Sequence, residues 1–398
     1  MSERQKTKHI SMIIRGIVGR SGGAERVYCE LANILVDAGY RVTCLYYDPK
    51  SGVPFYPLDP RVERINLHGS AGAKAYRNRS WIRPFSKRAR DEADWNRLNG
   101  LFVRQLREYF QLVGPDIAIS VMPPANTPVL MAASGTSVKV IACNHNVPDQ
   151  DYDNPKRWSP NPVDRQLRLS LLDNAAAIHV LFPEFGAWFP SHLSDRIVAI
   201  PNHISPDIVW PVPRPVREKV VLGVGRLTDV KNYMQLVSSW ALLADSFPDW
   251  KVKIFGVGPQ LEMLTQEIGR LGLDGRIELP GSLSDLSAEY AKASIFCHPA
   301  LFEGFGLSVA EALHLELPVV CYSDCSGVRE FVRDGYNGLT AERNGERDEL
   351  ADALRRLMVD EDLRLSLGAR GPDSVGSFTV KDYRARWIEL IEKTGRAA

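Results

Sequence analysis

The amino-acid sequence predicts an α/β protein built from two doubly wound parallel sheets. Short apolar strands alternate with amphipathic helices in both halves of the chain, a pattern typical of parallel sheets joined by crossover helices. The 398 residues suffice for two domains of ordinary size. A proline-rich stretch at 201–215 separates the halves and cannot supply a central strand. We therefore expect two α/β domains joined at this stretch.

The strands expected in the first half are short, mostly apolar runs at 9–14, 41–46, 117–121, 138–143 and 177–181. Those expected in the second half lie at 220–225, 252–255, 277–279, 295–298 and 319–322. Between them, helices are indicated by apolar residues at helical spacing, such as Leu31, Ile34 and Leu35 within 23–38. A last helix near 380–393 carries an apolar stripe of Tyr383, Trp387, Leu390 and Ile391.

The composition narrows the functional class. The net charge of +1 gives no reason to expect nucleic-acid binding, and no apolar run reaches the roughly 18 residues of a membrane-spanning helix. Residues 1–8 are polar and pass directly into a strand, so we expect no signal peptide. The six cysteines are scattered singly, and neither a Cys-x-x-Cys pair nor a His cluster forms a zinc pattern. A cytoplasmic protein with reduced thiols is expected.

The most informative motif runs from Glu303 to Glu311 and reads Glu-Gly-Phe-Gly-Leu-Ser-Val-Ala-Glu. It follows an apolar run at 294–299 and continues at helical spacing, so a strand, a glycine turn and a helix are expected in turn. Free amides at such a helix start can bind a phosphate, and Glu311 can accept hydrogen bonds from hydroxyl groups. A diphosphate and a diol together outline a nucleotide sugar. The alternative is a capping carboxylate followed by an exposed helical glutamate.

A second motif follows the strand expected at 220–225. Arg226 and Lys231 lie just beyond its end, where ligands bind in open α/β sheets. When a glycosyl diphosphate bond breaks, negative charge grows on the leaving diphosphate, and two preorganised cations can stabilise that charge. A surface pair of cations is the structural alternative.

Two features of the first half are weaker by themselves. The loop at 16–23 contains four glycines but lacks the Gly-x-Gly-x-x-Gly spacing of a dinucleotide site. Gly22 and Gly23 open the next helix, so their amides either face a phosphate or form a plain tight turn. His145 follows the strand at 138–143, at an edge where ligands bind, although a lone histidine is more often structural.

Three segments, taken in order, resemble glycosyltransferase family 4: Ser21-Gly22-Gly23-Ala24-Glu25, Gly225-Arg226-Leu227 with Lys231, and the motif at 303–311. Members of this family are retaining, nucleotide-sugar-dependent enzymes of the GT-B type, which has two Rossmann-like domains. The resemblance is strongest over 220–339 and weakest over 67–94. It implies an acceptor domain at 1–200, a donor domain at 201–377 and a terminal helix at 378–398 that packs back on the first domain.

The resemblance also implies roles for particular residues. Arg226 and Lys231 would take the place of a metal ion at the diphosphate. Glu303 would approach the donor sugar, and His145 would support the charge that develops on it. The donor-binding residues that it implies are Gly22, Gly23, Gly225, Gly304, Phe305, Gly306, Leu307 and Glu311, the last of them on the ribose hydroxyls. His203 and Ser326 stand where the family pattern has glycine, which weakens the case for binding at His203.

The partners implied are a nucleotide sugar and a saccharide acceptor, with no cofactor or metal required. A UDP-sugar is favoured over a GDP-sugar by prevalence alone, and the sugar is a hexose or an N-acetylhexosamine. Segment 74–107 carries ten Lys or Arg against three acids, with Trp81, Phe85 and Trp95 between them. It is either a solvated loop and helix face or a surface for anionic lipid. A lipid surface would suit a polyprenyl-diphosphate-linked acceptor at the cytoplasmic face of a membrane.

Other functions are compatible with parts of this pattern. A transferase acting on a soluble acceptor and a nucleotide-sugar epimerase share the expected architecture. A non-catalytic binder would retain Glu311 without needing Arg226, Lys231 and His145 together. A hydrolase with two carboxylates has no use for the cations and the glycine loops.

An Asp-x-Asp pattern in the first half leaves a choice of roles. Asp149, Asp151 and Asp153 lie in a polar segment rather than at a strand edge. They indicate a metal ion, a contact to an acceptor hydroxyl or a solvated acidic loop, and we expect the solvated loop.

Overall fold

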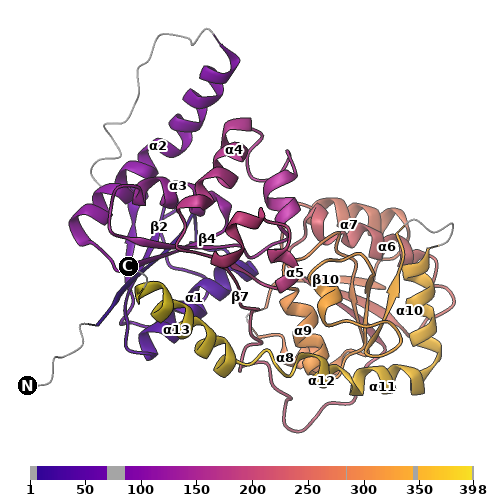
Figure 1. Cartoon of the computed structure of the whole chain (residues 1–398). Coiled ribbons are helices and arrows are strands. Elements are labelled where there is room, and N and C mark those ends of the chain that lie inside the picture. Colours follow the sequence, from indigo (N-terminus) through magenta and orange to yellow (C-terminus); the bar gives the residue numbers. More distant parts are fainter. Residues whose placement is uncertain (1–6, 70–85, 284, 344–347, 397–398) are drawn as a thin grey trace, which may run out of the picture. The chain divides into compact units, whose positions relative to one another are not determined.

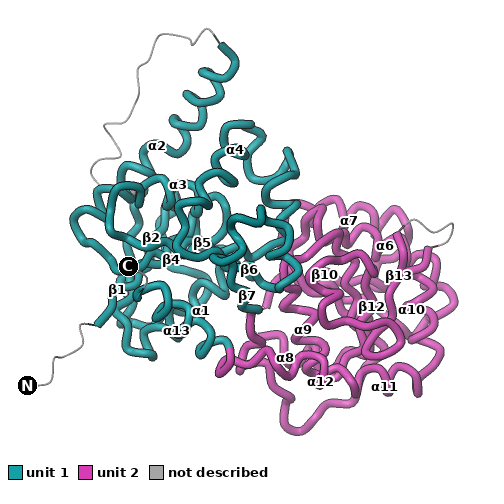
Figure 2. The backbone as a smooth tube through the Cα atoms, in the orientation of Figure 1, with its two compact units in different colours: residues 1–201, 383–398 teal, residues 202–382 magenta. Residues whose placement is uncertain are grey.

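The computed structural model of the chain describes residues 7–69, 86–283, 285–343 and 348–396. The chain folds into two compact units, each built on one sheet (Figures 1 and 2). Unit 1 comprises Met1–Pro201 and Tyr383–Ala398, and unit 2 comprises Asn202–Asp382. The predicted fold class, with two Rossmann-like parallel-sheet domains, is confirmed.

Unit 1 has a seven-stranded sheet in the order β3-β2-β1-β4-β5-β6-β7, and every strand pair in it is parallel. Its strands are β1 (His9–Ile14), β2 (Arg41–Tyr46), β3 (Glu63–Asn66), β4 (Ile117–Val121), β5 (Lys139–Cys143), β6 (Ala177–Val180) and β7 (Ile197–Ala199). Its helices are α1 (Gly23–Asp37), α2 (Lys87–Val113), α3 (Pro123–Ala133), α4 (Pro162–Ser170), α5 (Pro183–Gly186) and α13 (Val380–Arg396). The central strands β1 and β4 are buried along their whole length, as expected for a parallel sheet covered on both faces.

Unit 2 has a six-stranded parallel sheet in the order β10-β9-β8-β11-β12-β13. Its strands are β8 (Val220–Val224), β9 (Lys251–Phe255), β10 (Ile277–Gly281), β11 (Ile295–His298), β12 (Val319–Tyr322) and β13 (Gly338–Ala341). Its helices are α6 (Tyr233–Ala241), α7 (Leu261–Arg270), α8 (Ser287–Lys292), α9 (Leu307–His314), α10 (Glu349–Val359), α11 (Glu361–Ala369) and α12 (Gly371–Val375). Trp240 and Tyr233 of α6 are fully buried in the core of this unit.

The strand order reverses once in each sheet, between β1 and β4 in unit 1 and between β8 and β11 in unit 2. Loops leave opposite faces of a sheet at such a switch point, which opens a crevice at the carboxyl ends of the two strands. In unit 2 these two loops carry Arg226 with Lys231 and the motif that begins at Glu303. The strand order therefore brings two motifs that are far apart in sequence to the same edge of the sheet.

Five strands, β1, β2, β4, β11 and β12, begin and end at the residues that the sequence predicts. Three strands were not predicted. Strand β3 is at a sheet edge and begins with two exposed charged residues, Glu63 and Arg64, while β7 has only three residues. Strand β13 begins with Gly338, a residue that does not itself indicate a strand. Glycine is needed there because a Cβ would lie 2.2 Å from the carbonyl oxygen of Val319 in the neighbouring strand. Their short or polar sequences lack the apolar run that indicates a strand.

The terminal helix α13 packs on unit 1, because its apolar face is buried and its polar face is tied down. Tyr383 and Trp387 are 2% and 0% exposed. Glu392 accepts hydrogen bonds from Lys8 at 2.5 Å and from the Tyr40 hydroxyl at 2.9 Å. These contacts join the two ends of the chain within one unit.

Helix α2 holds the described part of the basic segment 74–107, while 70–85, with Trp81 and Phe85, lies outside the described residues. Trp95 is 3% exposed and its indole N–H donates to Asp164 at 2.8 Å, so it belongs to the core and not to a surface patch. Arg88 pairs with Glu92 and Arg104 with Glu108, which offsets part of the positive charge. Across the described ranges, no helix combines the length and the apolar character needed to cross a bilayer.

Candidate functional site

The switch point of unit 2 holds a largely buried ion pair. Lys231 ends a short 3-10 turn after β8, and Glu303 lies in the loop after β11. The Lys231 ammonium donates to Glu303 Oε1, and their side chains are only 19% and 16% exposed. The two residues are 72 positions apart in sequence. The sequence predicts both as site residues but does not predict that they pair.

His298 is a third member of this cluster. It is the last residue of β11, is fully buried, and places Nε2 3.3 Å from Glu303 Oε1. Burial lowers the pKa of His298, which keeps the imidazole neutral. Burial alone would raise the pKa of Glu303, but Lys231 and His298 outweigh it and bring that pKa down to about 2. The cluster is thus an ionised carboxylate held between an ammonium and a neutral imidazole.

Arg226 lies outside this cluster. It is exposed, and it forms no ion pair with any other residue that the structure describes. The glycine before it is needed for space, because a Cβ at Gly225 would lie 3.0 Å from the Tyr233 hydroxyl and 3.1 Å from Lys231 Cε. A side chain at position 225 would therefore crowd the Lys231 stem, while the exposed Arg226 faces solvent.

A glycine pair after β9 supports this loop and was not predicted as part of the site. A Cβ at Gly256 would lie 1.9 Å from the Gly225 carbonyl oxygen, and one at Gly258 would lie 2.3 Å from the Leu227 carbonyl oxygen. Any side chain at either position would displace the loop that carries Arg226. The signal was present in the sequence as a Gly-x-Gly directly after a strand.

The turn between Glu303 and α9 is built from close backbone contacts. Gly306 has φ +87°, and a Cβ there would lie 2.9 Å from Val328 Cγ2. Gly327 donates its N–H to the Glu303 carbonyl oxygen at 2.9 Å, and a Cβ on it would lie 2.2 Å from the Gly304 carbonyl oxygen. Gly306 is the N-cap of α9 and has no side chain, so no side chain caps the first amides of α9. The amides of Val309 and Ala310 donate to the Gly306 carbonyl oxygen, so those of Leu307 and Ser308 are the first-turn donors that a phosphate could use.

Two predicted donor-binding side chains are buried. Phe305 is 3% exposed and packs against Phe331 and Phe378, with ring centroids 5.5 and 5.0 Å apart, so only its backbone can face a ligand. Glu311 is also 3% exposed, and its Oε2 accepts a hydrogen bond from the Tyr290 hydroxyl at 2.9 Å. The alternative of an exposed helical glutamate at 311 is therefore wrong.

The glycine loop of unit 1 is organised by a carboxylate that was not predicted. Asp48, which lies beyond the end of β2 and is 1% exposed, accepts hydrogen bonds from the amides of Ile17 at 3.0 Å and Val18 at 3.1 Å. Burial alone would raise the pKa of Asp48, but the backbone donors lower it. Those two amides are therefore occupied, while no side chain caps the start of α1 at Gly22 and Gly23.

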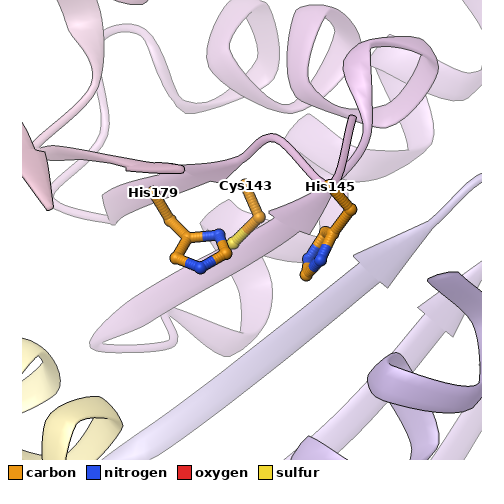
Figure 3. A group of neighbouring side chains, drawn as sticks. All are labelled: Cys143, His145 and His179. Carbon is orange, nitrogen blue, oxygen red and sulfur yellow. The ribbon is translucent and has the colours of Figure 1, made fainter. Parts of the chain in front are cut away.

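His145 lies in a cluster that is not apparent from the sequence. Cys143 ends β5 and pairs in register with His179 of β6, and His145 follows two residues after Cys143 (Figure 3). One potential ligand atom from each residue lies within 4.8 Å of the others. Within the described ranges, this is the one group of at least three such side chains at that spacing. The sequence does not indicate this grouping, because His179 comes from a neighbouring strand.

The expectation of a solvated loop at Asp149, Asp151 and Asp153 is wrong for the middle residue. Asp151 is 0% exposed, and its Oδ1 accepts hydrogen bonds from Asn146 at 3.1 Å and Trp158 at 2.9 Å. Burial raises the pKa of Asp151 to about 6, against the nearby arginines and these donors. The segment is a helical turn, and of the three aspartates Asp149 is half-buried and Asp153 is exposed.

Two family models together match most of the chain. The model described as "Glycosyl transferase 4-like domain" matches residues 22–203, and the model described as "Glycosyl transferases group 1" matches residues 205–374. The two matches meet close to the border between the units, which follows Pro201.

Individual relatives agree with these models over nearly the full length. An uncharacterised glycosyltransferase of Haemophilus influenzae is 26% identical over 96% of this chain and 100% of its own. A Campylobacter jejuni alpha-1,4-N-acetyl-D-galactosaminyltransferase, named for a GalNAc-containing saccharide on diNAcBac-PP-undecaprenol, is 24% identical over 98% of this chain and 99% of its own. The crystal structure of Anabaena HepE with UDP and glucose has a TM-score of 0.74 at 18% identity, covering 97% of this chain and all of that one. This last likeness concerns the fold.

Proposed function

The chain belongs to the glycosyltransferases of the GT-B fold, and from that premise we propose a retaining, metal-independent transferase. It moves a hexose or an N-acetylhexosamine from a nucleotide sugar, with UDP preferred to GDP, to a saccharide acceptor carried on a polyprenyl diphosphate. The observation that carries the proposal is the Lys231–Glu303 ion pair beside the uncapped start of α9.

The ion pair gives Lys231 a preorganised position. Glu303 holds the ammonium at the switch point before any donor arrives, so little reorganisation is needed when charge develops. Lys231 then bridges Glu303 and the departing diphosphate, and the exposed Arg226 supplies a second cation. The amides at Leu307 and Ser308 complete the set of donors.

The bond changes are those of a retaining transfer. The acceptor hydroxyl attacks the anomeric carbon on the face from which the diphosphate leaves, the glycosidic bond to the diphosphate breaks, and the hydroxyl proton passes to the leaving diphosphate. Glu303 orients the donor sugar, and His145 supports the positive charge on it. Glu311 is assigned to the ribose hydroxyls, which would have to replace or join the Tyr290 hydroxyl.

A lipid-linked acceptor is favoured by two observations. The Campylobacter jejuni relative is named for an undecaprenol-linked substrate. Helix α2 exposes Leu98 and Leu112 along with several arginines, a combination that a lipid surface with anionic headgroups attracts. A soluble acceptor is the second candidate.

The deciding experiment separates transfer from the rival activities. The purified chain is offered UDP- and GDP-sugars in excess chelator, with a polyprenyl-diphosphate saccharide or the matching free saccharide. We expect transfer to the lipid-linked acceptor with an α-linked product from an α-linked donor, identified by NMR. Epimerised donor without transfer would establish the epimerase, donor binding without turnover the non-catalytic binder, and loss of activity in chelator would refute metal independence.

A further inference from the structure

We propose that Cys143, His145 and His179 of unit 1 form a binding site for a thiophilic divalent cation of the Zn²⁺ type. Cys143 ends β5, His145 lies in the loop that follows and His179 lies in the adjacent strand β6, and one potential ligand atom of each lies within 4.8 Å of the others (Figure 3). Cys143 and His179 are partners in the β5–β6 register, so their side chains leave the same face of the sheet. Thiolate and imidazole are ligands that Zn²⁺ prefers.

The hydrogen bonding of His179 prepares it for a metal. Its Nε2 lies 2.8 Å from the Ile200 carbonyl oxygen, which can only accept, so Nε2 carries the proton. Nδ1 is therefore left with a lone pair, and it is buried without a hydrogen-bond partner. A metal-binding histidine almost always donates its other ring N–H to a carboxylate or a backbone carbonyl. His179 has the same arrangement, with Nε2 donating to a backbone carbonyl. It is fully buried, and a buried Nδ1 without a hydrogen-bond partner destabilises the fold unless a ligand binds it.

The cluster needs only a modest contraction to close on an ion. Zn–S and Zn–N bonds of about 2.3 and 2.0–2.1 Å place tetrahedral ligand atoms roughly 3.5 Å apart. His145 supplies the movement, because it lies beyond the end of β5 and is half-buried, while Cys143 and His179 are held in strands. On binding, the Cys143 thiol loses its proton to solvent and the thiolate bonds to the metal. Water takes the fourth position.

Packing is the simpler explanation for the cluster. The Trp387 ring lies 5.0 Å from the His179 ring, and His145 lies 5.1 Å from it, so the imidazoles also contribute to the core. Packing alone, however, does not explain a thiol and a lone-pair nitrogen placed in register at the same edge of the sheet. If the proposed function holds, Zn²⁺ also inhibits transfer, because it captures His145.

The test is a titration of the full chain, reduced and free of metal, with Zn²⁺ against a chromogenic chelator of known affinity. We expect one Zn²⁺ per chain, no comparable binding of Mg²⁺, and with Co²⁺ a thiolate-to-metal charge-transfer band. Cys143→Ser should weaken Zn²⁺ binding at least about 100-fold and abolish the cobalt band. The matched control is Cys44→Ser, which alters a buried cysteine of β2 in the same sheet and should leave both readouts unchanged.

His145→Asn provides a second variant if Cys143→Ser fails to fold. Its side chain is half-buried in a loop, and its loss should weaken Zn²⁺ binding at least about tenfold. Binding of less than one ion per chain, or equal loss in the Cys143 and Cys44 variants, overturns the site. Stoichiometric binding that leaves transfer uninhibited upholds the site and instead refutes the role proposed for His145.

Discussion

Replacing Lys231 by methionine should cost both stability and turnover, and the structure allows the two to be separated. The pKa of Glu303 is brought from 4.5 to about 2, chiefly by Lys231 once the opposing effect of burial is overcome. At about 1.4 kcal/mol per pKa unit, the ionised carboxylate gains roughly 3 kcal/mol from its surroundings in the folded state. Both side chains are less than a fifth exposed, so solvent screens this interaction only weakly. Lys231→Met leaves a buried carboxylate unpaired and should lower the free energy of unfolding by about 3 kcal/mol.

The assay is a double-mutant cycle measured by denaturant unfolding at pH 7. Glu303→Gln should also destabilise, since it leaves a buried ammonium unpaired, and the double variant should lose much less than the sum of the two. The pH dependence has a definite sign. Because the pKa of Glu303 is lowered on folding, its contribution is complete above about pH 4.5 and is lost as the pH falls toward 2. Lys231→Met should therefore lack most of this acid-side loss.

Turnover must behave differently from stability in the same cycle. Loss of a preorganised cation at the leaving group should lower kcat at least about 100-fold in Lys231→Met. The double variant should be equally slow, even though it loses less stability than the sum of the two single variants. A coupling energy below about 1 kcal/mol would refute the electrostatic reasoning. Recovery of turnover together with stability in the double variant would show that Lys231 is structural only.

Three further expectations can be tested on the same preparation. Arg226→Ala should lower kcat at least about 100-fold without changing the free energy of unfolding, because the side chain is exposed; equal turnover would remove it from the reaction. Glu311→Gln should weaken donor binding by about 1–3 kcal/mol in calorimetry, whereas Tyr290→Phe removes the internal bond to the same carboxylate and should not; equal effects would make Glu311 structural. For Asp151, with a folded pKa near 6 against 3.8, stability should fall by about 2 kcal/mol as the pH rises from 4 to 6, and Asp151→Asn should abolish that slope.

The architecture and the position of two motifs at strand ends were predictable because they depend on local patterns. Buried strands appear as apolar runs, and the two sheets follow from the alternation of strands and helices. The segment from Glu303 to Glu311 and the cations after β8 stand at strand ends, where ligands bind in any open α/β sheet. Edge strands such as β3 escaped prediction, since a half-exposed strand needs no continuous apolar run.

The partners of each site residue were decided only by the tertiary structure. The order β8-β11 places Lys231 against Glu303 and His298, and the order β5-β6 places His179 beside Cys143. A sequence specifies which segments become strands more directly than which strands become neighbours. Neighbour order follows from the packing of helices over the whole sheet, and with it come the burial and the charge environment that set the chemistry of each site.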